Sequence, residues 1–235
     1  MQNLPTDTIA AAGKWGDIGD WDVSAVKDFR YAFSLNRDVW GSHVDKGNPK
    51  AAAFVGNGIS KWNTAAVTTL WGTFHRYWDN DESEMNADLS GWDVAKVTTM
   101  VRAFHSTSKF TGTGLASWDT ASVTNTYLTF YRAYEMNADL GRWDVAKIAG
   151  MKSMFEAAQK FTGTGLDEWN VARVSSKTNG GFSRIFNGAT TFNSATSLAS
   201  CNRRKIADAW KSSAAFTKTT YDTAWSADKC TVRFE

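Results

Sequence analysis

Apolar residues recur along the chain in a frame that repeats six times. The frame reads Leu/Ile-x-x-Trp-Asp/Asn, and its tryptophans are Trp21, Trp62, Trp92, Trp118, Trp143 and Trp169. An aliphatic residue follows each tryptophan by five positions, and a phenylalanine follows the first five tryptophans by twelve. The tryptophans are spaced by 41, 30, 26, 25 and 26 residues. A recurring period of this length predicts a repeat protein whose units bury their apolar residues against their neighbours.

A longer period lies over the first. The segment MNADL occurs at 85–89 and again at 136–140, and KFTGTGL occurs at 109–115 and again at 160–166, so both recur after 51 residues. Two kinds of coil therefore alternate, as expected from duplication of a two-coil unit. The paired glycines of the second segment suit a corner with positive φ.

The pattern within one coil predicts two short elements. Trp92 and Val94 bracket a polar residue, which is the alternation of a short half-buried strand. Val97, Met100 and Phe104 follow at spacings of three and four, which suit a short helical turn packed inward. The sequence therefore predicts an α/β repeat of about six coils in which short strands pair in parallel.

The whole chain is expected to form one domain, 1–235. Residues 1–17, with Leu4, Ile9 and Trp15, are expected to cap one end of the repeats at 18–192, and residues 193–235 the other. Within the C-terminal cap, Cys201–Trp210 is expected to form a helix capped by Asn202, with Ile206 and Trp210 on one face. Insertions near 35–53 and 78–85 are either tolerated surface loops or part of a working face.

The frame L-x-x-W-D-V-A-x-V-T-x-M-x-x-x-F, read from Leu89 to Phe104, resembles the repeat of the BspA-like leucine-rich-repeat family. Members of that family read close to W-D-V-S-x-V-T-x-M-x-x-M-F, and the resemblance covers roughly residues 15–192. It implies a right-handed leucine-rich-repeat-like solenoid. It also implies adhesion or protein binding of the kind found in bacterial surface proteins.

Composition and charge exclude several classes of protein. The formal net charge is +2, and the densest basic run is Arg203-Arg204-Lys205, so no nucleic-acid partner is expected. No apolar stretch is long enough for a transmembrane segment, and the N-terminus shows no signal peptide. Three histidines outside any recognisable motif predict no enzyme, no metal and no cofactor.

The two cysteines, Cys201 and Cys230, flank the predicted C-terminal cap. A disulfide between them would indicate an oxidising compartment, either extracellular or the lumen of an organelle. Two buried thiols are the alternative reading.

A row of Asp or Asn follows the frame tryptophans and includes Asp93, Asp119 and Asp144. Exchange between Asp and Asn favours a structural role, in which each side chain accepts a hydrogen bond from a turn amide, over a ladder of cation ligands. The frame tryptophans themselves are expected to form the core.

Candidate partner-binding residues lie where the coils vary. Most are charged residues beside the frame, namely Lys96, Arg142, Lys147, Glu168 and Arg173. The others are the tryptophans near the two insertions, Trp40 and Trp78, and Trp71 is a further exposed candidate there. The leading hypothesis is a non-enzymatic protein-binding module on a surface or in a lumen. A structural subunit of a larger assembly is the alternative, and a glycan- or ice-binding surface with Thr111, Thr113, Thr162 and Thr164 is a third.

Overall fold

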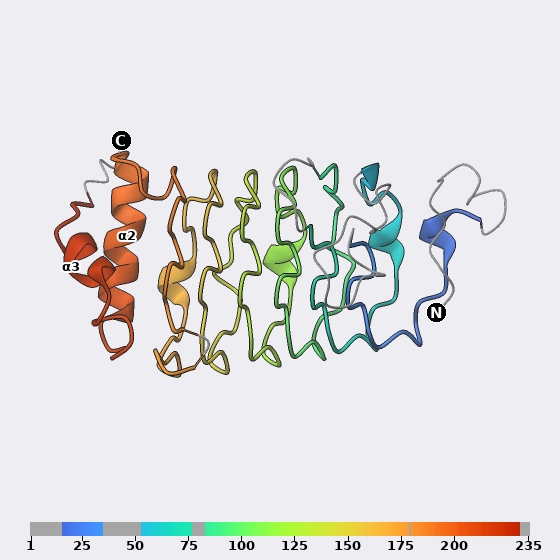
Figure 1. Ribbon diagram of the computed structural model, residues 1–235, viewed down its shortest axis with the longest axis horizontal. Coiled ribbons are helices and arrows are strands. Elements are labelled where there is room, and N and C mark those ends of the chain that lie inside the picture. Colours follow the sequence, from blue (N-terminus) through green and yellow to red (C-terminus); the bar gives the residue numbers. More distant parts are fainter. Residues whose placement is uncertain (1–15, 35–52, 77–82, 179, 231–235) are drawn as a thin grey trace, which may run out of the picture.

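The repeats stack as successive rungs along one long axis, with the C-terminal helices at one end (Figure 1). The computed structural model describes residues 16–34, 53–76, 83–178 and 180–230. Helices α2 (Ser197–Trp210) and α3 (Thr220–Ser226) lie beside the last rung (Figure 1). The predicted N-terminal cap residues Leu4, Ile9 and Trp15 fall outside the described part of the chain.

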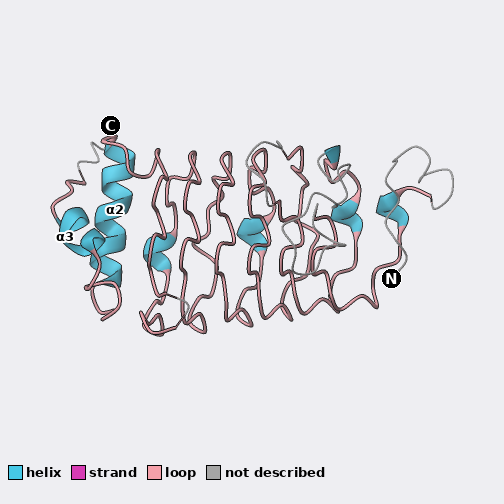
Figure 2. Cartoon of the chain, in the orientation of Figure 1, coloured by secondary structure: helices cyan, strands magenta, loops and turns pink. Residues whose placement is uncertain are grey.

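The predicted α/β leucine-rich-repeat-like solenoid is wrong. Across the described residues, extended pairing is limited to isolated parallel bridges that join Asp28 to Thr69, Thr69 to Thr99, and Thr99 to Asn125. No strand and no sheet is drawn there (Figure 2). The regular structure of the rungs consists of short 3-10 helices, η1 (Ile18–Asp20), η3 (Ile59–Lys61), η4 (Leu115–Ser117) and η5 (Leu166–Glu168).

Alternating hydrogen bonds explain why the rungs contain neither strand nor helix. The amides of Met100, Arg102 and Phe104 donate to carbonyls of the next rung at 3.0, 3.0 and 2.9 Å. The amides between them turn back, so that Ala103 donates to Met100 at 3.0 Å and His105 to Arg102 at 3.2 Å. A continuous strand would send no amide back into its own rung, and an α-helix would bond four residues back.

Each rung is therefore a run of four-residue turns, and this run misled the helix prediction. The turns overlap and start at every second residue, and those with a positive φ recur every four residues. This interval is close to the spacing of an amphipathic helix, and Val97, Met100 and Phe104 all point inward and are fully buried. In alternate turns the third residue takes a positive φ, as in a type II turn. Residues other than glycine fill most of these positions: Tyr31, Arg102, Ser106, Leu128, Arg132, Ser153, Ala157 and Arg184.

The predicted strand at Trp92–Val94 is instead a short link between two turns. The Trp92 amide donates to the Leu89 carbonyl at 3.1 Å, and the Val97 amide donates to the Val94 carbonyl at 2.8 Å. The apolar–polar alternation arises because this link leaves Asp93 exposed between buried Trp92 and Val94, as a strand would. The predicted positive φ at the corner glycines is present, for example 94° at Gly112 and 93° at Gly114.

Aromatic columns fill the interior of the stack. Phe74, Phe104 and Phe130 stack with ring centroids 5.6 and 5.4 Å apart, and Trp118 stacks on Trp143 at 6.3 Å. The indole N–H of each frame tryptophan from Trp62 onward donates to the backbone carbonyl of the frame Ile or Leu one rung earlier. These bonds satisfy the one polar atom of each buried indole.

Helix α2 completes the stack. Trp210 in α2 donates its indole N–H to Leu166 at 3.0 Å and stacks on Trp169 at 6.3 Å, so it extends the tryptophan column by one step. Thr196, not the predicted Asn202, is the N-cap of α2, and its side chain accepts from the amide of Ala199. Asn202 lies within the helix and donates to the Thr162 carbonyl at 2.8 Å.

Two further contacts fix the C-terminal cap. The sulfurs of Cys201 and Cys230 lie at bonding distance and form the predicted disulfide, which ties α2 to the segment after α3. The guanidinium of Arg203 is buried and donates to both carboxylate oxygens of Asp228, to Ser200 Oγ, and to the carbonyls of Phe192 and Ser194.

Candidate functional site

One side of the stack brings several aromatic rings and cationic side chains together. It is formed by the outer residues of six segments that backbone hydrogen bonds between rungs hold in register, with parallel bridges between the first four, namely 27–34, 68–76, 98–106, 124–132, 149–157 and 182–188. Because the turns of successive rungs are in register, equivalent side chains lie one beside the next along the stack. We call this surface the aromatic–cationic face.

The first row of this face centres on Tyr127. The Arg102 guanidinium lies 6.0 Å from the centroid of the Tyr127 ring, and the Lys152 ammonium lies 5.9 Å from it. These three residues come from three successive rungs, so the cations approach the ring from neighbours on either side. Trp71, in the same row, is 41% exposed, whereas Val101 between Trp71 and Tyr127 is buried.

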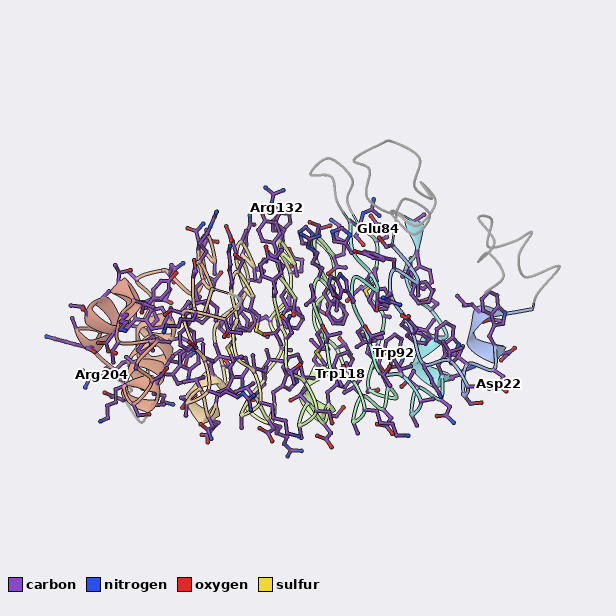
Figure 3. All side chains as sticks on the ribbon, turned by 60° about the horizontal axis from the view of Figure 1, so that its bottom comes forward. Asp22, Glu84, Trp92, Trp118, Arg132 and Arg204 are labelled. Carbon is purple, nitrogen blue, oxygen red and sulfur yellow. A yellow bond between two sulfur atoms is a disulfide. The ribbon has the colours of Figure 1, made fainter. Side chains whose placement is uncertain are left out.

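The second row is a file of rings in contact. Tyr31 lies 6.0 Å from His75, His75 lies 4.6 Å from His105, and His105 stacks on Tyr131 at 4.6 Å. Arg132 lies over Tyr131 at 5.2 Å and projects from the upper edge of the molecule (Figure 3). These stacked rings form a continuous aromatic row beside the cations.

Positive charge predominates on the aromatic–cationic face. Its acidic residues are Asp28 and Glu156, and each is already paired, Asp28 with Arg30 at 2.6 Å and Glu156 with Arg184 at 2.5 Å. The hydrogen bond from Arg30 lowers the pKa of Asp28. Its accessible cationic residues are Lys27, Arg30, Arg102, Arg132, Lys152 and Arg184, and Arg76 is buried beneath it. Arg102 and Lys152 form no ion pair with any described residue.

The histidines of the second row add no charge near neutral pH. Burial, with help from the Arg102 charge, lowers the pKa of His105 to about 4. Burial, then the neighbouring His105 and Arg102, holds the pKa of His75 well below its usual range. The charge of the face therefore comes from arginine and lysine, which stay protonated at physiological pH.

The side chains of the Asp row accept hydrogen bonds from nearby backbone amides. Asp93, Asp119 and Asp144 accept hydrogen bonds at 3.0, 3.0 and 2.9 Å from the backbone amides two residues later. Asp22, Asn63 and Asn170 make the same contact. In the part of the chain that the structure describes, no group of three or more His, Cys, Asp or Glu is arranged to hold a metal ion.

The charged candidates from the sequence are all exposed but do not form a basic patch. Lys96, Lys147 and Arg173 occupy one row, which Ser122 interrupts, and Arg142 and Glu168 occupy another. The Asp row runs between them, so this edge of the stack has mixed charge; Figure 3 shows Asp22 of that row at the lower edge. The candidates Trp40 and Trp78 lie outside the described residues.

Sequence reasoning missed Arg102, Tyr127 and Lys152. Tyr127 and Lys152 occupy the ninth position after their frame tryptophan, next to a position that is buried in every rung. Arg30 and Trp71 fill the same position in the first two rungs. The available signal was the recurrence of large aromatic or cationic residues at a position next to a core residue.

The stacked turns, the continuous aromatic core and the capped end define a repeat protein with one accessible aromatic–cationic face. The chain matches the family described as "Mycoplasma protein of unknown function, DUF285" over residues 10–77, 43–114 and 76–199. These matches cover most of the chain, and the protein belongs to this family. No curated protein and no solved structure matches it.

The family match corrects the resemblance suggested by the Trp-Asp-Val frame. No leucine-rich-repeat family matches the chain, and the family that does match has no assigned function. The shared frame specifies inward residues of a turn-built rung, and a leucine-rich repeat needs strands that the described rungs lack.

Proposed function

We propose that this protein is a non-enzymatic binding module that docks a protein partner on its aromatic–cationic face. The observation that carries the proposal is the row in which exposed Trp71 lies near Tyr127, with Arg102 and Lys152 on either side of the tyrosine. Tryptophan, tyrosine and arginine are the residues most enriched at energetically important positions of protein interfaces. A rigid stack presents them without a cost of ordering a loop.

A permanently bound structural subunit has less support. Such a subunit should expose a large apolar patch when isolated. Among the described residues, the large hydrophobic side chains that are exposed are Val55, Trp71 and Leu198, and Leu198 lies in α2, at the other end of the stack from Val55 and Trp71 (Figure 1). A glycan- or ice-binding threonine surface also has less support, because the hydroxyls of Thr111 and Thr113 lie within hydrogen-bond distance of each other, as do those of Thr162 and Thr164.

A surface or lumenal location forms part of the proposal. The disulfide between Cys201 and Cys230 suits an oxidising compartment. The described helices include none with the length and apolar character needed to cross a bilayer.

An affinity pull-down from extract of the source cells, read by mass spectrometry, tests the proposed function. The variant Trp71→Ala/Tyr127→Ala should lose the partner that the native protein captures. The control Val55→Ala/Leu198→Ala also removes two accessible apolar side chains but lies off the face, and it should retain the partner.

A third variant reverses the charges of Lys96, Arg142, Lys147 and Arg173. It distinguishes the mixed-charge edge from the aromatic–cationic face. Retention of the partner by the aromatic variant and its loss from this charge-reversed variant would place binding on the edge and contradict the proposal.

A further inference from the structure

The aromatic–cationic face has an excess of positive charge where its rings are most accessible. The carboxylates of Asp28 and Glu156 are taken up by Arg30 and Arg184 at the two ends of the face. Around Tyr127, Arg102 and Lys152 approach the ring and have no carboxylate partner among the described residues. A partner that supplies carboxylates there would complete two ion pairs without breaking one.

The tyrosine holds the two cations in place. A cation near an aromatic ring is attracted by the negative face of the ring. Arg102 and Lys152 are therefore partly ordered before a partner arrives, and less side-chain entropy is lost when an anion binds. Since the two cations lie in rungs on either side of Tyr127, their separation runs along the stack, at about 4.8 Å for each step between rungs.

We propose that the partner docks an acidic polypeptide segment, rich in Asp and Glu, along this row of the face. The inference rests on the proposed protein-binding function and specifies the chemistry of the partner. The carboxylates pair with Arg102 and Lys152, and the apolar stems of the acidic side chains pack on Tyr127 and Trp71.

The surroundings of the row favour a short acidic segment over other anions. The adjoining edge of the stack carries the Asp row, including Asp93, Asp119 and Asp144, all exposed. Together with the Lys and Arg rows beside it, the Asp row gives this edge a mixed charge, so a long polyanion such as a nucleic acid finds no continuous cationic track beyond the face, whereas a short segment needs none. A neutral glycan needs an open ring to stack on, and the Tyr127 ring is approached by two cations.

Fluorescence polarisation with a labelled decaglutamate peptide tests the inference on the full chain. We expect saturable binding at low salt that weakens as salt is added. The variant Arg102→Ala/Lys152→Ala should weaken binding by about tenfold or more. Its matched control, Arg142→Ala/Lys205→Ala, also removes two exposed charges but off the face, and it should stay within about twofold of the native protein. Circular dichroism melts of each variant verify that it is folded.

Three outcomes would overturn the inference. Equal weakening in the two double variants would mean that the peptide responds to overall charge. Tighter binding of a heparin oligosaccharide or a single-stranded oligonucleotide, in competition with the peptide, would identify a different polyanion. Absence of peptide binding would also reject the acidic segment. If the extract partner still depends on Trp71 and Tyr127 in that last case, the proposed function stands and this inference alone has failed.

Discussion

The stack and the C-terminal cap are held together in opposite ways. In the stack, the same contacts recur from rung to rung, such as the stacking of Trp118 on Trp143 and of Phe104 on Phe130. In the cap, single contacts occur once, and the largest are the Arg203 guanidinium with its ring of acceptors and the disulfide at Cys230. The stability of the stack is a sum over neighbours, whereas that of the cap depends on a few groups.

Trp210 is a residue of the cap that makes the recurring contacts of the stack. It belongs to α2, yet its ring and its indole N–H take the place of a frame tryptophan in the next rung. The cap therefore covers the apolar end of the stack by copying the contact that the stack already uses. Substitutions in the stack and in the cap should therefore have different effects on stability.

The largest effect is expected from a column residue in the middle of the stack. Replacing Trp118 with alanine should lower the free energy of unfolding by about 3–5 kcal/mol, because it leaves a cavity and breaks the bond to the Leu89 carbonyl. Trp71→Ala, at an exposed ring, is the control and should cost less than about 1 kcal/mol. Urea unfolding measures both, and equal losses would mean that the column does not carry the stability of the stack.

A somewhat smaller effect is expected in the cap. The disulfide closes a loop with a sequence separation of 29 residues. The chain-entropy model gives the Cys201→Ser/Cys230→Ser variant a loss of about 3.6 kcal/mol. Hydrogen exchange should show α3 losing protection while amides such as that of Met100, bonded between rungs, keep theirs. Simultaneous loss in both regions would mean that the cap and the stack unfold as one unit.

Acid should weaken the stack more than the cap. His105 has a folded pKa of about 4, below its unfolded value near 6.5, so the unfolded chain binds the proton more readily. The stabilising effect of the neutral ring is complete above about pH 6.5 and is lost as the pH falls toward 4, at a cost of roughly 3 kcal/mol. Unfolding measured from pH 7 to 4 should show this slope, and His105→Gln should reduce it, with the remainder due to His75, whose pKa is also lowered. An unchanged slope in the variant would assign the effect to other groups.

The smallest effect concerns the turns themselves. Ala157 has a φ of 59°, which a glycine adopts without strain, so Ala157→Gly should stabilise the protein by about 0.5 kcal/mol. Ala146 is as accessible but is not among the residues with positive φ, and Ala146→Gly should destabilise by about 0.5–1 kcal/mol. Thermal melts of the two variants should therefore shift in opposite directions.

The core positions of the stack could be predicted from the sequence, but the local geometry could not. Spacing alone identified Trp118, Phe104 and Val97 as inward residues, because any stacked repeat must bury its apolar side chains. A run of four-residue turns places such residues at the same intervals as a helix does. Only glycine would have signalled the positive φ of each turn, and Arg102 and Leu128 stand where glycine is expected.

The candidate site was harder to predict than the core. Arg102, Tyr127 and Lys152 are each 25 residues from the next, and only the register of the rungs brings them together. The charged residues beside the frame, such as Lys96 and Arg142, attracted attention because they vary. In a single sequence, variation on a solvated edge and variation on a binding surface look alike.

The hydrogen bonds between rungs give the molecule an adjustable length. Each rung bonds its amides to the rung beside it, as Met100 does to Asn125, so a new unit placed between two rungs finds partners on both sides. The natural unit is the pair of rungs that recurs after 51 residues. One more copy would add about 10 Å between Trp71 and Leu198 and leave the surroundings of each unchanged. The number of two-rung units therefore sets the distance between the two ends of the stack.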